Sequence, residues 1–135
     1  MPSASSSLQQ SIFSTLSANA ALTALVGSDR IYDDVPQGSP LPYLTIGQTT
    51  IRDWSTATED GNEHILTLHV WSGAKGKKET SEIMGAIRTA LHDQPLTLTG
   101  HRLVNLRHEF SEARRAPDGE TIHGIARFRA VTEPA

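Results

Sequence analysis

The sequence predicts one α+β domain over residues 1–135: an antiparallel sheet of about four strands with a long C-terminal β-hairpin, and two main helices packed on one face. Three observations carry this prediction. Apolar residues alternate through 63–71, the period of a strand with one buried face. Apolar residues recur at every third or fourth position through 83–91, the period of a helix. A turn sequence at 115–119 then separates two further alternating segments.

The alternating strand at 63–71 is predicted to be the middle strand of the sheet. Leu66, Leu68 and Val70 fall on its buried face. The helix that follows would pack three apolar residues across this face: Ile83, Ile87 and Leu91. The strand and the helix therefore form one packing unit.

The N-terminal region predicts a first helix of about three turns, because Leu8, Ile12 and Leu16 share one helical face. Asn19 is a suitable N-cap for a short second helical segment at 20–26, which a glycine closes. Residues 1–7 carry no basic residue before their apolar positions. They are predicted to be a polar lead-in to the first helix and not a signal peptide.

The region between these helices and the central strand is predicted to be mostly extended or irregular. A short extended piece at 29–34 precedes a loop at 35–42, where three prolines prevent ladder pairing. Residues 43–48 alternate as a strand that continues to about Ile51. A polar connection at 53–62 then leads into the central strand.

Trp54 stands in this polar connection, with Arg52 and Asp53 before it. An exposed indole costs hydrophobic free energy. Trp54 is therefore either folded back on the core or offered to a partner, and the length of the loop favours the partner. Arg52, Asp53 and Trp54 are candidate interface residues on this ground.

The C-terminal region predicts a long antiparallel hairpin, with arms at 102–111 and 120–131 that project beyond the core. Two small residues in its second arm, Gly124 and Ala126, would let a helix pack closely. The first arm is predicted to alternate strictly, with four residues on one face: Val104, Leu106, His108 and Phe110.

Charge is unevenly placed along the chain. The net charge of −3 argues against attraction of the whole surface to nucleic acid. Residues 29–63 hold seven acidic residues and two bases, whereas residues 101–131 hold six arginines, including Arg114 and Arg115 near the hairpin tip. These regions either meet across subunits or are separate solvated loops. Nine of the twelve bases are arginine, which favours protein–protein contact.

The patterns that indicate catalysis are absent from the sequence. There is no cysteine and no Gly-x-Ser-x-Gly elbow, and the carboxylates are scattered. The turn at 73–78 lies where a phosphate loop would lie, but it has Trp71 in place of the first glycine and Lys78 in place of the Ser or Thr. We therefore expect no enzyme, no nucleotide site and no cofactor.

The sequence also predicts no metal site and no membrane span. Asp33 and Asp34 lack a third ligand nearby, and His64 and His69 would lie on opposite faces of one strand. The other histidines show no metal-binding spacing on a helix. No apolar run reaches 18 residues.

Short stretches spread in order over nearly the whole chain share a pattern with one known family. These stretches are 20–27, 30–33, 35–38, 41–47, 66–71, 86–92, 118–124 and 128–130. Together they resemble the tail-completion proteins, or tail terminators, of long-tailed phages and gene transfer agents. The match is more specific than any single motif because it covers the elements in sequence order.

The resemblance implies a structural virion protein with no catalytic residues to transfer. Its expected partners are further copies of itself in a ring, usually of six, the major tail tube protein, and the head–tail connector or stopper. The ring would cap the head-proximal end of the tail tube, stop its growth and join it to the head, with DNA passing through it. Assembly would take place in the host bacterial cytoplasm. The alternative is a neck or head-completion adaptor of the same particle.

Overall fold

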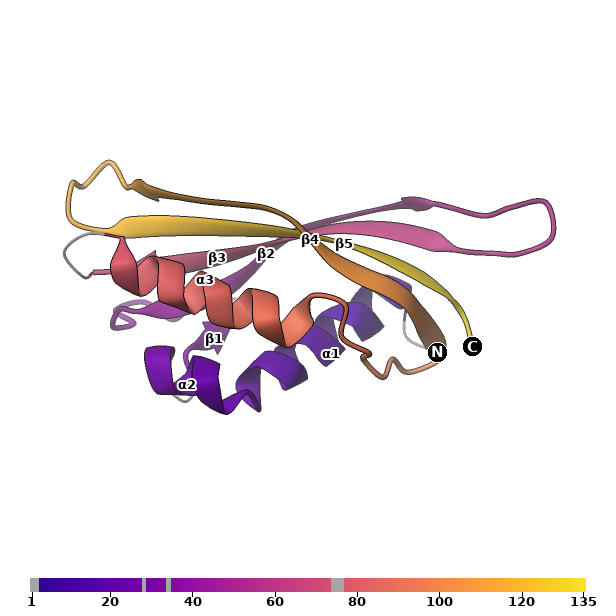
Figure 1. Cartoon of the computed structure of the whole chain (residues 1–135), viewed down its shortest axis with the longest axis horizontal. Helices are drawn as coiled ribbons and strands as arrows, with labels where there is room; N and C mark the ends of the chain where they lie inside the picture. Colours follow the sequence, from indigo (N-terminus) through magenta and orange to yellow (C-terminus); the bar gives the residue numbers. More distant parts are fainter. Residues whose placement is uncertain (1–2, 28, 34, 74–76) are drawn as a thin grey trace.

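The fold is a single curved sheet with three helices on one of its faces (Figure 1). The computed structural model describes residues 3–27, 29–33, 35–73 and 77–135. The elements in chain order are α1 (Ala4–Ser17), α2 (Ala20–Val26), β1 (Ile31–Tyr32), β2 (Tyr43–Asp53), β3 (Asn62–Ser72), α3 (Lys78–Leu91), β4 (His101–Arg115) and β5 (Ile122–Pro134). Met1, Pro2, Asp34 and the 74–76 part of the predicted turn lie outside the described residues.

The sheet has the order β1-β2-β3-β5-β4, with β3 in the middle as predicted. Its four long strands pair antiparallel, which confirms the predicted fold class. The short β1 adds a fifth strand, parallel to the start of β2, with Ile31 opposite Leu44. Both α2, with its Asn19 cap, and the loop at 35–42 also lie where the sequence predicts them.

The pairing of β3 with β5 runs without a shift from Asn62 opposite Thr132 to Ser72 opposite Ile122. Because these strands are antiparallel, the β2–β3 hairpin and the β4–β5 hairpin lie at opposite ends of the sheet (Figure 1). The β2–β3 hairpin projects well past the helices, and the chain termini lie toward the same end (Figure 1).

The core lies between the helices and the even-numbered residues of β3 and β5. Leu68, Val70 and Phe128 on the sheet are fully buried, as are Ile83 and Ile87 on α3. Helix α3 approaches the sheet closely where β5 has a small residue, as predicted. A Cβ atom added at Gly124 would lie 2.7 Å from Thr80 Cγ2 and 2.9 Å from Met84 Sδ. A side chain at this position would therefore push the helix away.

The predicted polar lead-in at residues 1–7 is wrong in part, because α1 already begins at Ala4. Ser3 is its N-cap, and its Oγ accepts a hydrogen bond from Ser6 N at 3.1 Å. Ser7 is buried, and its hydroxyl donates to the carbonyl of Thr99 at 2.8 Å. The helix thus begins within this polar segment, because Ser3 caps it and the buried Ser7 hydroxyl has a partner in the connection before β4.

The strict alternation predicted for the first arm of the C-terminal hairpin is also wrong. Bulges interrupt the β4–β5 register at Val104 and Glu109, so that Leu103 and Leu106 both face the core. Val104 is 51% exposed, whereas Leu106 is 1% exposed. An extra residue in one strand shifts the side-chain phase by one, which the sequence alone does not reveal.

None of the described helices combines the length and apolarity needed to cross a bilayer.

Replacing Ile87 with Asp should abolish folding, because it places an unpaired carboxylate in the fully buried contact between α3 and the sheet. The expected loss is several kcal/mol, a large share of the stability of a small domain. Ser81→Asp on the exposed side of the same helix is the control and should melt close to wild type. A cooperative melt of Ile87→Asp near the wild-type temperature would contradict this packing.

Candidate assembly surfaces

The loop end of the β2–β3 hairpin is held by one carboxylate shared between two arginines. Arg52 Nε on β2 donates to Glu63 Oε1 at 2.5 Å, and Arg129 Nε on β5 donates to Glu63 Oε2 at 2.5 Å. The Glu63 side chain is only 6% exposed, whereas that of Arg52 is 68% exposed. Glu63 therefore links three strands on the face of the sheet that carries no helix.

These arginines also hold the carboxyl group in its charged form. The hydrogen bond from Arg129 is the largest cause that lowers the pKa of Glu63, and the hydrogen bond from Arg52 adds to it. Burial acts in the opposite direction but is outweighed. The group is thus an ionised carboxylate at neutral pH, with both oxygens occupied, and it is not available as a proton donor or a metal ligand.

Trp54 lies over the same two arginines. Its ring centroid is 5.1 Å from the Arg129 guanidinium carbon and 5.8 Å from that of Arg52. The indole is nevertheless 49% exposed. The two predicted alternatives were burial against the core and exposure to a partner. The fold places Trp54 outside the core, where its ring makes cation–π contacts with Arg52 and Arg129 and about half of its surface is exposed to solvent.

The hairpin loop that follows Trp54 is ordered by local hydrogen bonds. Trp54 N donates to the Gly61 carbonyl at 2.9 Å. The Asp53 carboxylate accepts from Ser55 N at 3.2 Å and from Ser55 Oγ at 2.6 Å. Arg52, Asp53 and Trp54 therefore occur together on one well-formed, protruding end of the sheet.

Arg114 and Arg115 lie at the opposite end of the sheet, on the exposed tip of the β4–β5 hairpin. The turn is closed by Asp118, whose carboxylate accepts from Thr121 N and Glu120 N at 2.8 Å each. These hydrogen bonds lower the pKa of Asp118, and the bond from the backbone of Thr121 has the largest effect. The structure thus separates the candidate interface residues into two groups that cannot meet within one subunit.

A stack of aromatic side chains on the helix-free face of the sheet was not predicted from the sequence. His69 Nδ1 and His123 Nε2 are 2.8 Å apart, and the Trp71 and His123 rings stack with centroids at 3.9 Å. The shared face of His69 and Trp71 is visible in the sequence, but their partner on β5 depends on the β3–β5 register. Gly47 makes room, since a Cβ there would lie 2.6 Å from His69 Nε2.

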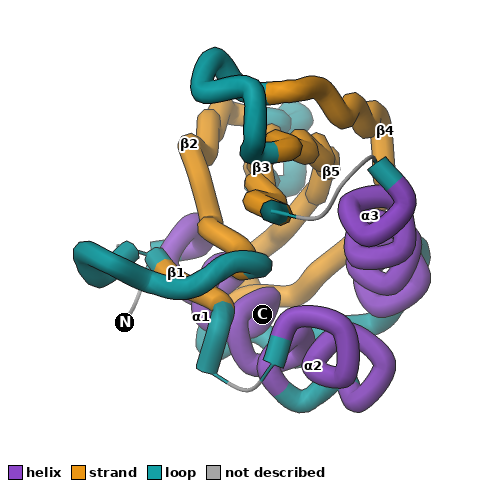
Figure 2. Tube along the Cα trace, turned by 90° about the vertical axis from the view of Figure 1, so that its left-hand side faces the viewer, coloured by secondary structure: helices purple, strands orange, loops and turns teal. Residues whose placement is uncertain are grey.

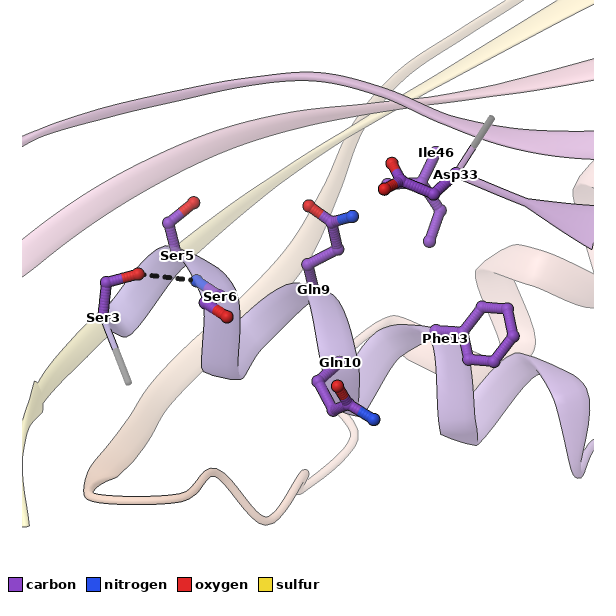
Figure 3. A pocket seen from close by; sticks show the side chains of 8 residues that line it. All are labelled: Ser3, Ser5, Ser6, Gln9, Gln10, Phe13, Asp33 and Ile46. Carbon is purple, nitrogen blue, oxygen red and sulfur yellow. Dashed lines mark hydrogen bonds between the residues drawn. The ribbon is translucent and has the colours of Figure 1, made fainter. Parts of the chain in front are cut away.

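A shallow depression of about 400 Å³ runs along α1 beside the outer edge of β2 (Figure 3). The side chains of Ser5 and Gln9 rise from α1 toward the edge that carries Asp33 and Ile46 (Figure 3). The described residues that line it include serines and one carboxylate but no histidine, lysine or arginine. None of the hydrogen bonds of the described residues joins the Asp33 carboxylate to a serine hydroxyl here, and no histidine lines the depression.

Within the described part of the chain, no group of three His, Asp or Glu side chains could hold a metal ion. His64 is buried against the Thr132 hydroxyl at 2.9 Å, and the His92 ring accepts from His108 N at 2.9 Å. Asp33 is described but its neighbour Asp34 is not, so the predicted weakness of an Asp33/Asp34 metal site remains a prediction.

Comparisons with known proteins find one family. The family model described as tail completion protein gp17 matches residues 10–133. The tail completion protein gp17 of Bacillus phage SPP1 is 26% identical over 126 residues, which cover 93% of this chain and 92% of the relative.

Two solved structures share the fold. A chain in the virion of a native gene transfer agent particle superposes with a TM-score of 0.89 at 32% identity, covering 98% of this chain and 99% of that one. The structure of bacteriophage SPP1 gp17 superposes with a TM-score of 0.64 at 24% identity, covering 94% and 89%. The second likeness supports the fold only.

Replacing Glu63 with Gln should lower the melting temperature at neutral pH, because it leaves Arg52 and Arg129 without their shared anion. The pKa of Glu63 is lowered on folding, so its contribution is present above its ordinary value of 4.5 and is lost as pH falls through the folded value. As the pH falls below 4.5, the free energy of unfolding should therefore decrease less for Glu63→Gln than for wild type.

Thermal melts at a series of pH values measure this effect, and Glu82→Gln on the exposed side of α3 is the matched control. If the melting temperatures of wild type and Glu63→Gln fell by the same amount across the acidic range, the role given to Glu63 would be refuted.

Proposed function

We propose that this chain, which belongs to the gp17 family of tail completion proteins, is a tail terminator that forms a ring on the head-proximal end of the tail tube. The family match establishes the coarser function: the chain is a tail completion protein of a phage or gene transfer agent particle, and a tail component of the virion. The resemblance inferred from the sequence and its virion location are thereby confirmed. The ring, its six copies and its capping role belong to the proposal.

The observation that carries the proposal is the likeness over 98% of the chain to a chain of an assembled gene transfer agent virion. The likeness therefore includes every helix and strand and is not confined to one motif. The described residues also form no group of three His, Asp or Glu side chains that could hold a metal ion. A structural role in the particle accounts for these features, and the tail tube protein and the head connector are the proposed neighbours.

The two ends of the sheet suit a ring. A ring made by head-to-tail contacts needs two different, complementary patches on each subunit. One end presents Arg52, Asp53 and Trp54 in a region with further acidic residues, and the other presents Arg114 and Arg115. We assign these groups to the two sides of the subunit contact. Surface ion pairs contribute up to about 1 kcal/mol each, so their main effect is on orientation and encounter rate.

Particles made without this chain should have tails of uncontrolled length that do not join heads. The reason is that a tube without a terminator has no signal to stop growing and no surface for the connector. Electron microscopy of lysates from a deletion strain measures both properties, and a strain that carries the gene in trans is the control.

Tail length separates the proposed function from its alternative. Tails of normal length that fail to join heads would favour the neck adaptor, and normal tails on filled heads would exclude both.

Reversing the charge of the hairpin tip with Arg114→Glu and Arg115→Glu should leave the monomer folded but weaken ring assembly. The weakening should be greater at low salt, where repulsion from the acidic partner surface is least screened. Sedimentation in the presence of tail tubes measures assembly. Lys78→Glu with Arg88→Glu on exposed positions of α3 changes the net charge equally and should have a smaller effect. Unchanged assembly of the tip variant at all salt concentrations would remove these arginines from the interface.

A further inference from the structure

Among the described residues, two segments of the sheet lie at its edges without a neighbouring strand. Strand β1 covers β2 only at Leu44 and Thr45, so residues 49–53 form an open edge. On the other side, the connection after α3 covers the first half of β4, where Asp93 N donates to the Leu106 carbonyl at 2.8 Å. Among the described residues, no strand lies beside 111–115. An open edge presents unpaired N–H and C=O groups.

The hairpin ends fix which backbone groups point outward. Trp54 N bonds to the Gly61 carbonyl and Ala116 N to the Thr121 carbonyl, so these residues face their own partner strands. Backbone direction alternates along an antiparallel strand. The outward groups are therefore those of Thr49, Ile51 and Asp53 on β2, and of Ser111, Ala113 and Arg115 on β4.

The side chains of these two sets lie on the same face of the sheet. Ile51 is opposite His64 and Ala113 is opposite Gly124, and the even-numbered residues of β3 and β5 face the helices. Because β2 and β4 also run in opposite directions, the two edges match as an antiparallel pair whose sheets keep their helices on one side. Mismatched faces or directions would have excluded such a pair.

We propose that copies of this chain assemble by adding residues 49–53 of one copy to residues 111–115 of the next, which gives a sheet that continues from subunit to subunit. This inference rests on the proposed function, since it specifies how the ring is held together. The contact is head to tail, as a ring requires, because it uses two different edges of each subunit. Main-chain hydrogen bonds would supply the contact that the surface charges alone do not.

Charge selects one register for this pair. With Ile51 opposite Ala113, the exposed Arg52 falls opposite Glu112 of the neighbouring copy, which is a favourable cross-strand pair. A shift by two residues in one direction would place Arg52 opposite Arg114 instead. Ile51 is 44% exposed in the single subunit, and the added strand would cover it.

The depression along α1 borders β2 at Ile46, just before the open edge at 49–53 (Figure 3). In this register Arg115 of the neighbour lies opposite Thr49 with its side chain on the helix side. Asp33 follows the end of β1 and lines the depression together with Ile46. The neighbour's Arg115 would therefore approach this carboxylate, and the added strand would cover part of Phe13 on α1, which is 39% exposed.

Cysteine cross-linking tests the register directly, because the chain has no cysteine of its own. Ile51→Cys combined with Ala113→Cys would place two thiols on facing residues, with Cα atoms about 5.5 Å apart. Within one subunit β2 and β4 are separated by two strands, or about 14 Å, so no internal disulfide is possible. Thr50→Cys with Ala113→Cys is the control, because Thr50 points to the other face.

Particles that carry each variant are purified, oxidised and run on a non-reducing gel. We expect a ladder of cross-linked multimers for the first pair and monomer for the control. Two results would overturn the edge contact, provided that the variant and wild-type chains are present in the particles. One is no ladder for the first pair, and the other is an equal ladder for both pairs. Either result would leave the proposed function unaffected. Absence of the wild-type chain from tail ends would instead overturn the proposed function.

A proline provides a second test that does not depend on thiol chemistry. Ala113→Pro removes an N–H that points away from β5, so the monomer should remain folded, whereas ring assembly should weaken at least about tenfold. Glu112→Pro, one residue away, removes a bond to β5 and should mainly lower the melting temperature. Wild-type assembly by a folded Ala113→Pro variant would overturn the proposed contact.

Discussion

The uninterrupted pairing of β3 with β5 is the constraint on which the rest of the structure depends. Eleven residue pairs, from Asn62–Thr132 to Ser72–Ile122, join two strands that are distant in sequence. This register brings Arg129 to Glu63 and His123 to Trp71, and it brings Gly124 under α3. It also sends the two hairpins to opposite ends. A shift by one residue would place the apolar residues of β3 and β5 on opposite faces of the sheet, so that one set would face solvent.

The helices and β1 cover the sheet unevenly, and the uncovered strand segments are the proposed sites of contact with further copies. Figure 2 shows the helices on one side of the strands, with β1 against only the start of β2. The helices bury the middle of one face. Within the described part of the chain, residues 49–53 of β2 and 111–115 of β4 have no neighbouring strand on their outer side, and they lie at opposite ends of the sheet. A protein that acts alone commonly protects such edges, because they pair with other chains. In a subunit of a virion, open edges can form the contacts with neighbouring subunits.

The sequence predicted the parts of this fold that depend on local periodicity. The buried stripe through Leu68 and the helical stripe through Ile87 were identified because each repeats within one element. The bulge at Val104 was missed, because an extra strand residue leaves no compositional sign. The site was predicted only in part: Arg52, Asp53 and Trp54 are neighbours in sequence, but their link to Arg129 through Glu63 spans 66 residues and exists only once the register is set.

Hydrogen–deuterium exchange tests most directly the claim that this chain completes the tail by joining its sheet edges to further copies. The exchange of the outward amides at Ile51 and Ala113 is compared between the free subunit and the subunit in intact particles. The account predicts fast exchange in the free subunit and strong protection at both edges in the particle, with little change at Leu68 in the core. Equally fast exchange of both edges in particles that contain the chain would contradict it.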